Sequence, residues 1–287
     1  MSATVSLLHP ERGDAAMTAE RKETKYLVPY DSVDSLVHAF AQQLPSHRFT
    51  GHQANRLPDA HHYVTTVYFD TASHAHYRAA LRNAEHNVKL RAKEYYDVHP
   101  SLAEVATDPA ELLRYHPWLW FELKRREGER TLKCRFRLPK RDVPAFFAGE
   151  RLSADPPEHS SIAPEAPNET PLEEIERYCR ALGEPLTVSC LVNYRRLSFQ
   201  DAEGSLRITL DLGLAFYAPP PELWTRERPL ERSGLGRARE TLTTAVLEVK
   251  RRAALPPWLS ELLAGTGLES SAFSKFVAAA RAVHGDV

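Results

Sequence analysis

The chain has 287 residues, a formal net charge of −1 and 43% hydrophobic residues. This length allows a sizeable core, and the neutral charge argues against a general nucleic-acid-binding protein, which is usually basic overall. The three cysteines are odd in number and lack a C-x-x-C spacing, which argues against a disulfide framework or a zinc site. No apolar run approaches the about 18 residues of a membrane span and no signal peptide is recognisable, so the sequence favours a cytoplasmic protein.

The first half of the chain alternates between strands and short helices. We expect residues 1–17 to form a flexible tail and residues 18–287 to form a single domain. Strands are predicted from β-branched and aromatic content, and helices from apolar residues at helical spacing. In chain order the predicted elements are a strand at 20–28, a helix at 31–44, a strand at 63–70, a helix at 73–81, strands at 87–96, 120–126 and 131–138, and a short helix that begins at Asp142.

The second half of the chain continues this pattern between two loops. Residues 153–171 and 218–240 are rich in proline with polar or basic residues, which is typical of loops. The fold class predicted for the whole chain is therefore α+β, with eight strands that are mostly antiparallel. In chain order the remaining elements are a helix at 172–182, strands at 186–199, 205–217 and 242–251, and helices at 257–264 and 271–283.

Four of the predicted strands carry charges at every second position. Side chains two residues apart lie on the same face of a strand, so each segment has one charged and one largely apolar face. Burying so many ions in a dry core would be very costly, so we expect these faces to line solvent or a wet cavity for a polyanion. A closed eight-stranded barrel would give them one shared interior. The segments are Lys89/Arg91/Lys93, Glu122/Lys124/Arg126, Lys133/Arg135/Arg137 and Glu248/Lys250/Arg252.

Backbone phosphate-binding loops are absent from the sequence. It contains no G-x-x-x-x-G-K-[ST] motif and no complete G-x-G-x-x-G motif, and the H-E-x-x-H and G-x-S-x-G motifs are also missing. A phosphate site would therefore be built from side chains. Arginine offers a planar fork for phosphate oxygens, and lysine acts as a movable point charge.

Eight short motifs occur in order along the chain. With this ordered set the sequence resembles the VTC domain, the polyphosphate polymerase domain of the vacuolar transporter chaperone complex. That domain is one of the triphosphate tunnel metalloenzymes, which are related to the CYTH proteins. The motifs are R-x-E-x-K-Y (Arg21, Glu23, Lys25, Tyr26), Y-F-D (Tyr68–Asp70), K-L-R (Lys89, Arg91), E-x-K (Glu122, Lys124), Y-x-R-x-x-F (Tyr194, Arg196, Phe199), R-I-T-L-D (Arg207–Asp211), L-E-V-K (Leu247–Lys250) and S-K-F (Ser274–Phe276).

The resemblance implies a fold and a set of site residues. The implied fold is an eight-stranded closed β-barrel, the triphosphate tunnel, with flanking helices. Glu248 would bind a divalent metal, Mn or Mg, with Glu23 and Glu122 as weaker metal candidates. The phosphate-binding catalytic residues would be Lys25, Lys89, Arg91, Lys124, Arg196, Arg207 and Lys275, and those that also hold the nucleotide would be Lys25, Arg91, Lys93, Arg196, Arg207 and Lys250.

The implied activity is transfer of the γ-phosphate of ATP to a growing polyphosphate chain. ATP and inorganic polyphosphate or pyrophosphate would be the ligands, nucleic acid would not, and a membrane protein is a candidate partner. A tripolyphosphatase or nucleoside triphosphatase would use the same grip on phosphate, and a non-catalytic polyphosphate- or nucleotide-binding module is a further alternative. Adenylate cyclase chemistry, known in CYTH relatives, is more distant. The sequence departs from the yeast members after E-x-K, where Arg125 and Arg126 stand in place of a histidine.

Overall fold

The computed structural model describes residues 22–46, 61–83, 85–96, 118–128, 130–150, 159–162, 170–225 and 229–286. The predicted tail at 1–17, Arg21 of the first motif and most of the predicted loop at 153–171 lie outside these ranges. The structure divides into two compact units. Unit 1 takes its described residues from Met1–His62, Arg196–Leu212 and Thr244–Ser271, and unit 2 takes its described residues from Tyr63–Arg195, Gly213–Thr243 and Ala272–Val287.

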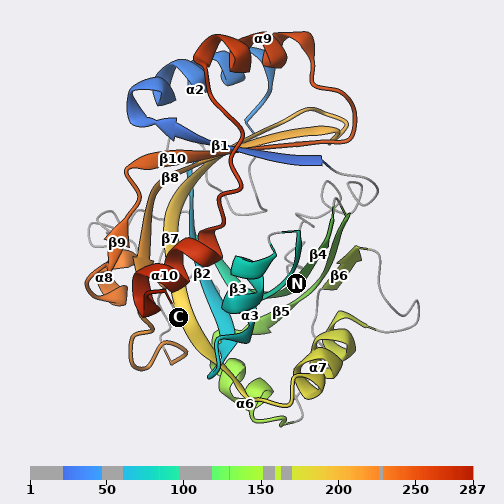
Figure 1. The fold of residues 1–287 in the computed structure, drawn as a ribbon, viewed down its shortest axis with the longest axis vertical. Helices are drawn as coiled ribbons and strands as arrows, with labels where there is room; N and C mark the ends of the chain where they lie inside the picture. Colours follow the sequence, from blue (N-terminus) through green and yellow to red (C-terminus); the bar gives the residue numbers. More distant parts are fainter. Residues whose placement is uncertain are drawn as a thin grey trace, which may run out of the picture. The chain divides into compact units, whose positions relative to one another are not determined.

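The fold class is α+β, as predicted, with a large antiparallel sheet and seven α-helices in the described part of the chain (Figure 1). The strands are β1 (Lys22–Pro29), β2 (His61–Thr71), β3 (His86–Tyr96), β4 (Trp118–Glu127), β5 (Arg130–Pro139), β6 (His159–Ile162), β7 (Leu186–Gln200), β8 (Leu206–Tyr217), β9 (Glu240–Thr241) and β10 (Thr244–Arg251). The helices are α2 (Val33–Gln43), α3 (Ala75–Arg82), α6 (Val143–Phe147), α7 (Pro171–Ala181), α8 (Arg232–Leu235), α9 (Pro257–Thr266) and α10 (Lys275–His284).

The eight predicted strands all occur, and two short strands were not predicted. β6 lies inside the predicted loop at 153–171, and α8 and the start of β9 lie inside the predicted loop at 218–240. β6 pairs with β5 and β9 pairs with β8. Backbone hydrogen bonds at a sheet edge require no apolar pattern. These short segments therefore carry no periodic signal that could reveal them in the sequence.

The prediction of a closed barrel is not confirmed, because the described strands follow an open path. The order is β1-β10-β8-β7-β2-β3-β4-β5-β6, with β9 paired to β8. The outer edge of β5 is taken by β6. The edge of β1 away from β10 is taken by another segment, because Tyr26 pairs with Ser270 and the Lys25 carbonyl accepts from the Ser271 amide at 2.7 Å. Among the described strands, β1 and β6 are thus the two ends of the sheet.

Unit 1 packs helices α2 and α9 on one face of its strands. The alternation of apolar residues on β1, β8 and β10 turns every second side chain toward these helices. The Phe40 ring of α2 lies 5.7 Å from the ring of Phe199 at the end of β7, in a tilted arrangement. The remaining side chains of these strands lie on the opposite face, which is mostly polar. Members of the apolar cluster include Leu36, Phe40, Tyr26, Val28, Ile208, Leu210, Leu247, Val249, Leu259 and Leu263.

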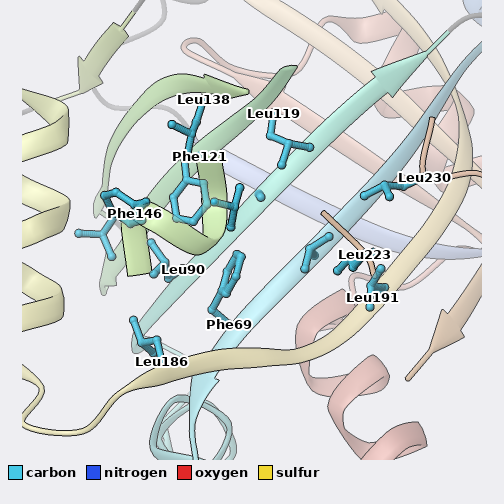
Figure 2. Packing of buried hydrophobic residues seen from close by; sticks show 14 of the residues in the cluster. Phe69, Leu90, Leu119, Phe121, Leu138, Phe146, Leu186, Leu191, Leu223 and Leu230 are labelled. Atoms are coloured by element: carbon cyan, nitrogen blue, oxygen red, sulfur yellow. The ribbon is translucent and has the colours of Figure 1, made fainter. Parts of the chain in front are cut away.

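Unit 2 has an apolar core on one face of β2 to β5. Figure 2 shows side chains from several strands converging with Phe146 of α6. The Phe69 and Phe121 rings are 5.2 Å apart, and Phe121 and Phe146 are also 5.2 Å apart. Helix α10 packs against α3, and its Phe276 contacts Tyr68 at 5.1 Å. Because Phe69 is in the apolar core and Tyr68 is its neighbour in the strand, α10 lies toward the other face of β2.

Whether residues 18–287 act as one domain stays a prediction. Strands β7 and β8 contribute residues to both units. Among the residues that the structure describes, no helix is both long and apolar enough to cross a membrane.

Candidate functional site

The charged face of unit 2 is organised into three rows across β3, β4 and β5. Antiparallel pairing places Lys89 opposite Lys124, and Lys124 opposite Lys133. The strand alternation predicted from the sequence is confirmed, since the apolar neighbours of these residues form the core. The three rows, each written from β3 to β5, are Lys89–Lys124–Lys133, Arg91–Glu122–Arg135 and Lys93–Trp120–Arg137.

Glu122 holds Arg91 and Lys133 in the middle of this face. Arg91 Nε donates to Glu122 Oε1 at 2.6 Å, and Lys133 Nζ lies 3.0 Å from Glu122 Oε2. The Glu122 side chain is 1% exposed. Burial by itself would raise the pKa of this carboxyl, but Arg91, Lys133 and Lys93 outweigh it and hold the pKa well below its ordinary value. Glu122 is therefore a charged partner of cations, and both of its oxygens are occupied.

Helix α10 brings its first turn to the same face of unit 2. The Ser274 hydroxyl caps the helix by accepting from the Val277 amide, and it also accepts from Lys89 Nζ at 3.0 Å. Lys275 Nζ lies 5.2 Å from the centre of the Tyr194 ring. Burial raises the pKa of the nearby Tyr68 to about 12, although Arg91 and Lys275 oppose this shift. The structure thus places Lys275 beside Tyr194 in unit 2, and its phosphate-binding role stays a prediction.

Unit 1 carries its own charged cluster on the face opposite α2 and α9. Arg196 forms a bidentate pair with Asp211, with distances of 2.5 Å from Nε to Oδ1 and 2.7 Å from Nη2 to Oδ2. Glu248 Oε2 lies 3.0 Å from Lys250 Nζ and 3.9 Å from Arg196 Nη2. Asp211 is fully buried and Glu248 is 7% exposed. Asp211 fixes the orientation of the Arg196 fork.

Three other predicted residues lie on the same face of unit 1. Arg207 Nε donates to Gln200 Oε1 at 2.5 Å, which orients the guanidinium. Lys25 Nζ lies 3.5 Å from Glu23 Oε1. Lys25 is paired in register with Glu248, and Glu23 is paired with Lys250. The polar face of unit 1 therefore gathers Glu23, Lys25, Arg196, Arg207, Glu248 and Lys250.

A divalent metal would fit this cluster if substrate phosphates completed its coordination. Across the described ranges, no three His, Cys, Asp or Glu side chains gather in a group that could hold a metal ion. Magnesium is often held by one or two carboxylates, with substrate phosphates completing its coordination. Glu248, a carboxylate in a polar cluster of unit 1, fits that kind of site. The metal roles of Glu248, Glu23 and Glu122 stay predictions.

The two arginines that replace the family histidine do not lie on the charged face. Arg125 is buried on the apolar side of β4, where Nη1 is 3.4 Å from Glu174 Oε1 of α7 and the guanidinium lies over Tyr178 at 5.5 Å. Arg126 is exposed at the end of β4, and its Nε donates to the Gly128 carbonyl at 3.1 Å. Arg125 thus attaches a helix to the sheet, and Arg126 supports the hairpin turn.

Sequence reasoning missed Lys133 and Gln200 as partners of the site residues. Lys133 was recognised as part of an alternating segment but was not assigned to the site. The signal was present in the hairpin turn, because pairing Glu127 with Arg130 places Lys124 opposite Lys133 and Glu122 opposite Arg135. The same argument applies to Gln200, which lies opposite Arg207 across the turn between β7 and β8 because the Asp201 amide donates to the Leu206 carbonyl.

Comparison with known families decides the classification of the chain. A family model described as VTC domain matches residues 20–284. The chain belongs to the VTC domain family. The resemblance inferred from the ordered motifs is thereby confirmed, and membership in this family supports a triphosphate tunnel enzyme. No curated protein matches the VTC chain.

Solved structures resemble this VTC domain only at a distance. A Hippeastrum protein described as an adenylyl cyclase with a dominant triphosphatase activity has 14% identity and a TM-score of 0.46, and the match covers 90% of this chain and 94% of that one. A Bacillus halodurans protein assigned as an adenylate cyclase has 11% identity and a TM-score of 0.46, with coverage of 90% and 97%. A Pyrococcus horikoshii protein has 9% identity and a TM-score of 0.38, with coverage of 90% and 97%. At these scores the likenesses carry no argument about function.

Proposed function

We propose that this VTC domain is a metal-dependent polyphosphate polymerase that transfers the γ-phosphate of ATP to the end of a phosphate chain. Family membership supports this proposal, and so does the chemistry of both charged faces. We further propose that it works in the cytoplasm, where ATP is supplied, and that a membrane protein is a candidate partner. ATP, polyphosphate and pyrophosphate are the proposed ligands.

The row of three opposed lysines on unit 2 is the observation that carries the proposal. Lys89, Lys124 and Lys133 lie side by side in register on three neighbouring strands. Like charges directly opposite each other destabilise a sheet. A fold that keeps such a row gives up stability, and a polyanion bound along it would convert the repulsion into attraction.

The proposed chemistry needs positioning and charge neutralisation more than covalent help. An oxygen of the terminal phosphate of the chain attacks the γ-phosphorus of ATP, and the bond to the β,γ-bridging oxygen breaks so that ADP leaves. The attacking oxygen is already anionic, so no residue has to remove a proton. Arg91 and Arg196 would bind phosphate oxygens with forks that Glu122 and Asp211 already orient.

The remaining residues would neutralise phosphate charge. Each lysine supplies a mobile point charge to the phosphates, and Arg207, held by Gln200, supplies an oriented guanidinium. Glu248 would hold a divalent metal, which would supply Lewis-acid neutralisation of phosphate charge. The lysines are Lys25, Lys89, Lys93, Lys124, Lys250 and Lys275.

The products distinguish this proposal from its alternatives. Purified protein would be incubated with ATP and Mn or Mg, and the products separated on a gel stained for polyphosphate while ADP and free phosphate are quantified. A ladder of chains with matching ADP supports a polymerase. ADP with an equal amount of free phosphate and no ladder would identify a hydrolase, and binding of ATP without turnover would identify a binding module.

Two variants and a matched control test whether the activity depends on Glu248 and Arg91. Glu248→Gln should abolish the metal-dependent rate, and Arg91→Lys should lower it by about 100-fold because the fork to phosphate is lost while the charge is kept. Arg141→Ala is the control, because the Arg141 side chain is 85% exposed and lies outside both charged faces. Unchanged activity in Glu248→Gln protein would contradict the proposal.

A further inference from the structure

The charged face of unit 2 ends in a stack of aromatic rings and guanidinium groups. The Arg135 guanidinium lies 4.4 Å from the centre of the Trp120 ring. Arg137 lies 5.8 Å from the Trp120 ring and 5.3 Å from the Trp118 ring. The four side chains therefore form one ladder in the order Arg135, Trp120, Arg137 and Trp118. We call this set the Trp–Arg ladder.

The ladder lies on the same face as the lysine and arginine rows. Trp120 is in register with Lys93 on β3 and with Arg137 on β5. Trp118 precedes Trp120 by two residues and so shares its face, whereas Leu119 and Phe121 lie in the apolar core. Both tryptophans are half-buried. Two large aromatic rings are thus held on a charged face, away from the core that would bury them fully.

The spacing of the rows fits a ligand that is anionic at one end and aromatic at the other. Successive rows lie about 7 Å apart along the strands, so the three rows from Lys89 to Lys93 span about 13 Å. That is comparable to the extended triphosphate and ribose of a nucleotide. Nucleobases stack on aromatic side chains and on arginine planes. Two tryptophan rings lie at the Trp118 end of this face, and Lys89 at the opposite end contacts the Ser274 hydroxyl. Tyr68 lies in register with Arg91 between them.

We propose that the Trp–Arg ladder is the base-binding part of a nucleoside triphosphate site, with the base stacked on the Trp118 end of the ladder and the phosphates extending along Lys93, Arg91 and Lys89. This inference rests on the proposed function for the triphosphate ligand and adds the group that would let the face recognise a nucleotide. Inorganic tripolyphosphate would use the cationic rows alone. The ladder would therefore discriminate ATP from a bare phosphate chain.

The test compares a ligand with a base and a ligand without one. A non-hydrolysable ATP analogue and inorganic tripolyphosphate would be titrated calorimetrically into wild-type, Trp120→Leu, Trp120→Phe and Trp118→Leu proteins. Loss of stacking should weaken the analogue about tenfold in Trp118→Leu protein, while tripolyphosphate stays within about twofold. Trp120→Leu should weaken the analogue by a smaller factor, because it removes the ring that holds Arg137 beside Trp118. Trp120→Phe keeps a ring and should recover most of the affinity. Trp258→Leu, on α9 of unit 1, is the matched control.

Tryptophan fluorescence gives a second readout that a purely structural role would not produce. The ATP analogue should quench wild-type fluorescence, tripolyphosphate should not, and the quench should shrink in Trp120→Leu and Trp118→Leu proteins. Equal losses for both ligands, or no loss for either, would overturn the inference. If the wild type binds tripolyphosphate as tightly as the ATP analogue, the base-binding inference is wrong, while the polymerase proposal still stands. The titration measures binding and needs no turnover. If the protein made no polyphosphate chains, the polymerase proposal would be wrong, but the titration would still test base binding.

Discussion

Single carboxylate residues in this protein orient the side chains of arginine and lysine. Glu122 contacts Arg91 and Lys133 with its two oxygens, and Asp211 contacts the fork of Arg196. An arginine held in one rotamer loses less freedom when it binds phosphate. In the proposed phosphate sites, acidic residues would thus set much of the binding geometry without touching the ligand themselves.

Replacing Glu122 by Gln should destabilise the protein by about 3 kcal/mol, because it leaves two cations without their buried counter-charge. Urea denaturation measures the change. Glu127→Gln is the control, since Glu127 is exposed on the same strand. If Glu122 instead serves mainly as a metal ligand, the variant would keep its stability and require more metal for activity.

The same variant should change how stability depends on pH. The folded pKa of Glu122 lies well below the ordinary value of 4.5, so the ionised carboxylate stabilises the fold fully above that value. This contribution is lost as the pH falls below 4.5 toward the folded pKa. The gap in unfolding free energy between wild type and Glu122→Gln should therefore be constant near neutrality and narrow in acid. If this difference in unfolding free energy grew in acid, the ionised form of Glu122 would not be the form that stabilises the fold.

The pairing of strands determines which charged side chains lie next to each other. Each of β3, β4 and β5 by itself is an ordinary strand with a charged face. Their register places three lysines in one row and puts Glu122 in the row of Arg91 and Arg135. The hairpin of β4 and β5 therefore creates a surface with more positive charge than any of its strands shows alone.

Lys124→Met should stabilise the free protein by about 0.5 kcal/mol, because it relieves repulsion in the middle of the lysine row. The same change should reduce the rise in melting temperature that tripolyphosphate produces by binding the folded state. Thermal melts with and without tripolyphosphate measure both effects. Lys22→Met is a control, since Lys22 is exposed at the start of β1. A destabilised variant with an unchanged ligand shift would contradict this account of the row.

In the whole molecule, two strands belong partly to one compact unit and partly to the other. β7 and β8 each supply residues to unit 1 and to unit 2. A strand that loses its pairing at one end is weakened along its length, which favours cooperative unfolding. This sharing is the physical basis for treating residues 18–287 as a single domain.

We therefore expect one unfolding transition. Far-ultraviolet circular dichroism and tryptophan fluorescence should give coincident curves in urea. Hydrogen exchange measured by mass spectrometry should give similar opening free energies for peptides from β10 in unit 1 and β4 in unit 2. Two separate transitions, or protection of one unit while the other exchanges freely, would show two independent folding units.

The sequence by itself determined the fold class, the eight main strands and the family. Period-two alternation is a local property, so the charged faces of β3, β4, β5 and β10 could be predicted without any knowledge of their partners. The ordered motifs identified the VTC domain, which the family comparison confirmed. The turn at residues 127–130 even contained the register that opposes Lys124 and Lys133.

Only the tertiary structure decided which charges meet and where the sheet ends. The contact of Lys275 with Tyr194 joins side chains from α10 and β7, and no local pattern encodes it. The described sheet ends at β6, which lies on the outer edge of β5, and at β1, whose outer edge pairs with residues 270–271. Edge pairing is made by backbone groups common to all residues, so composition does not reveal it.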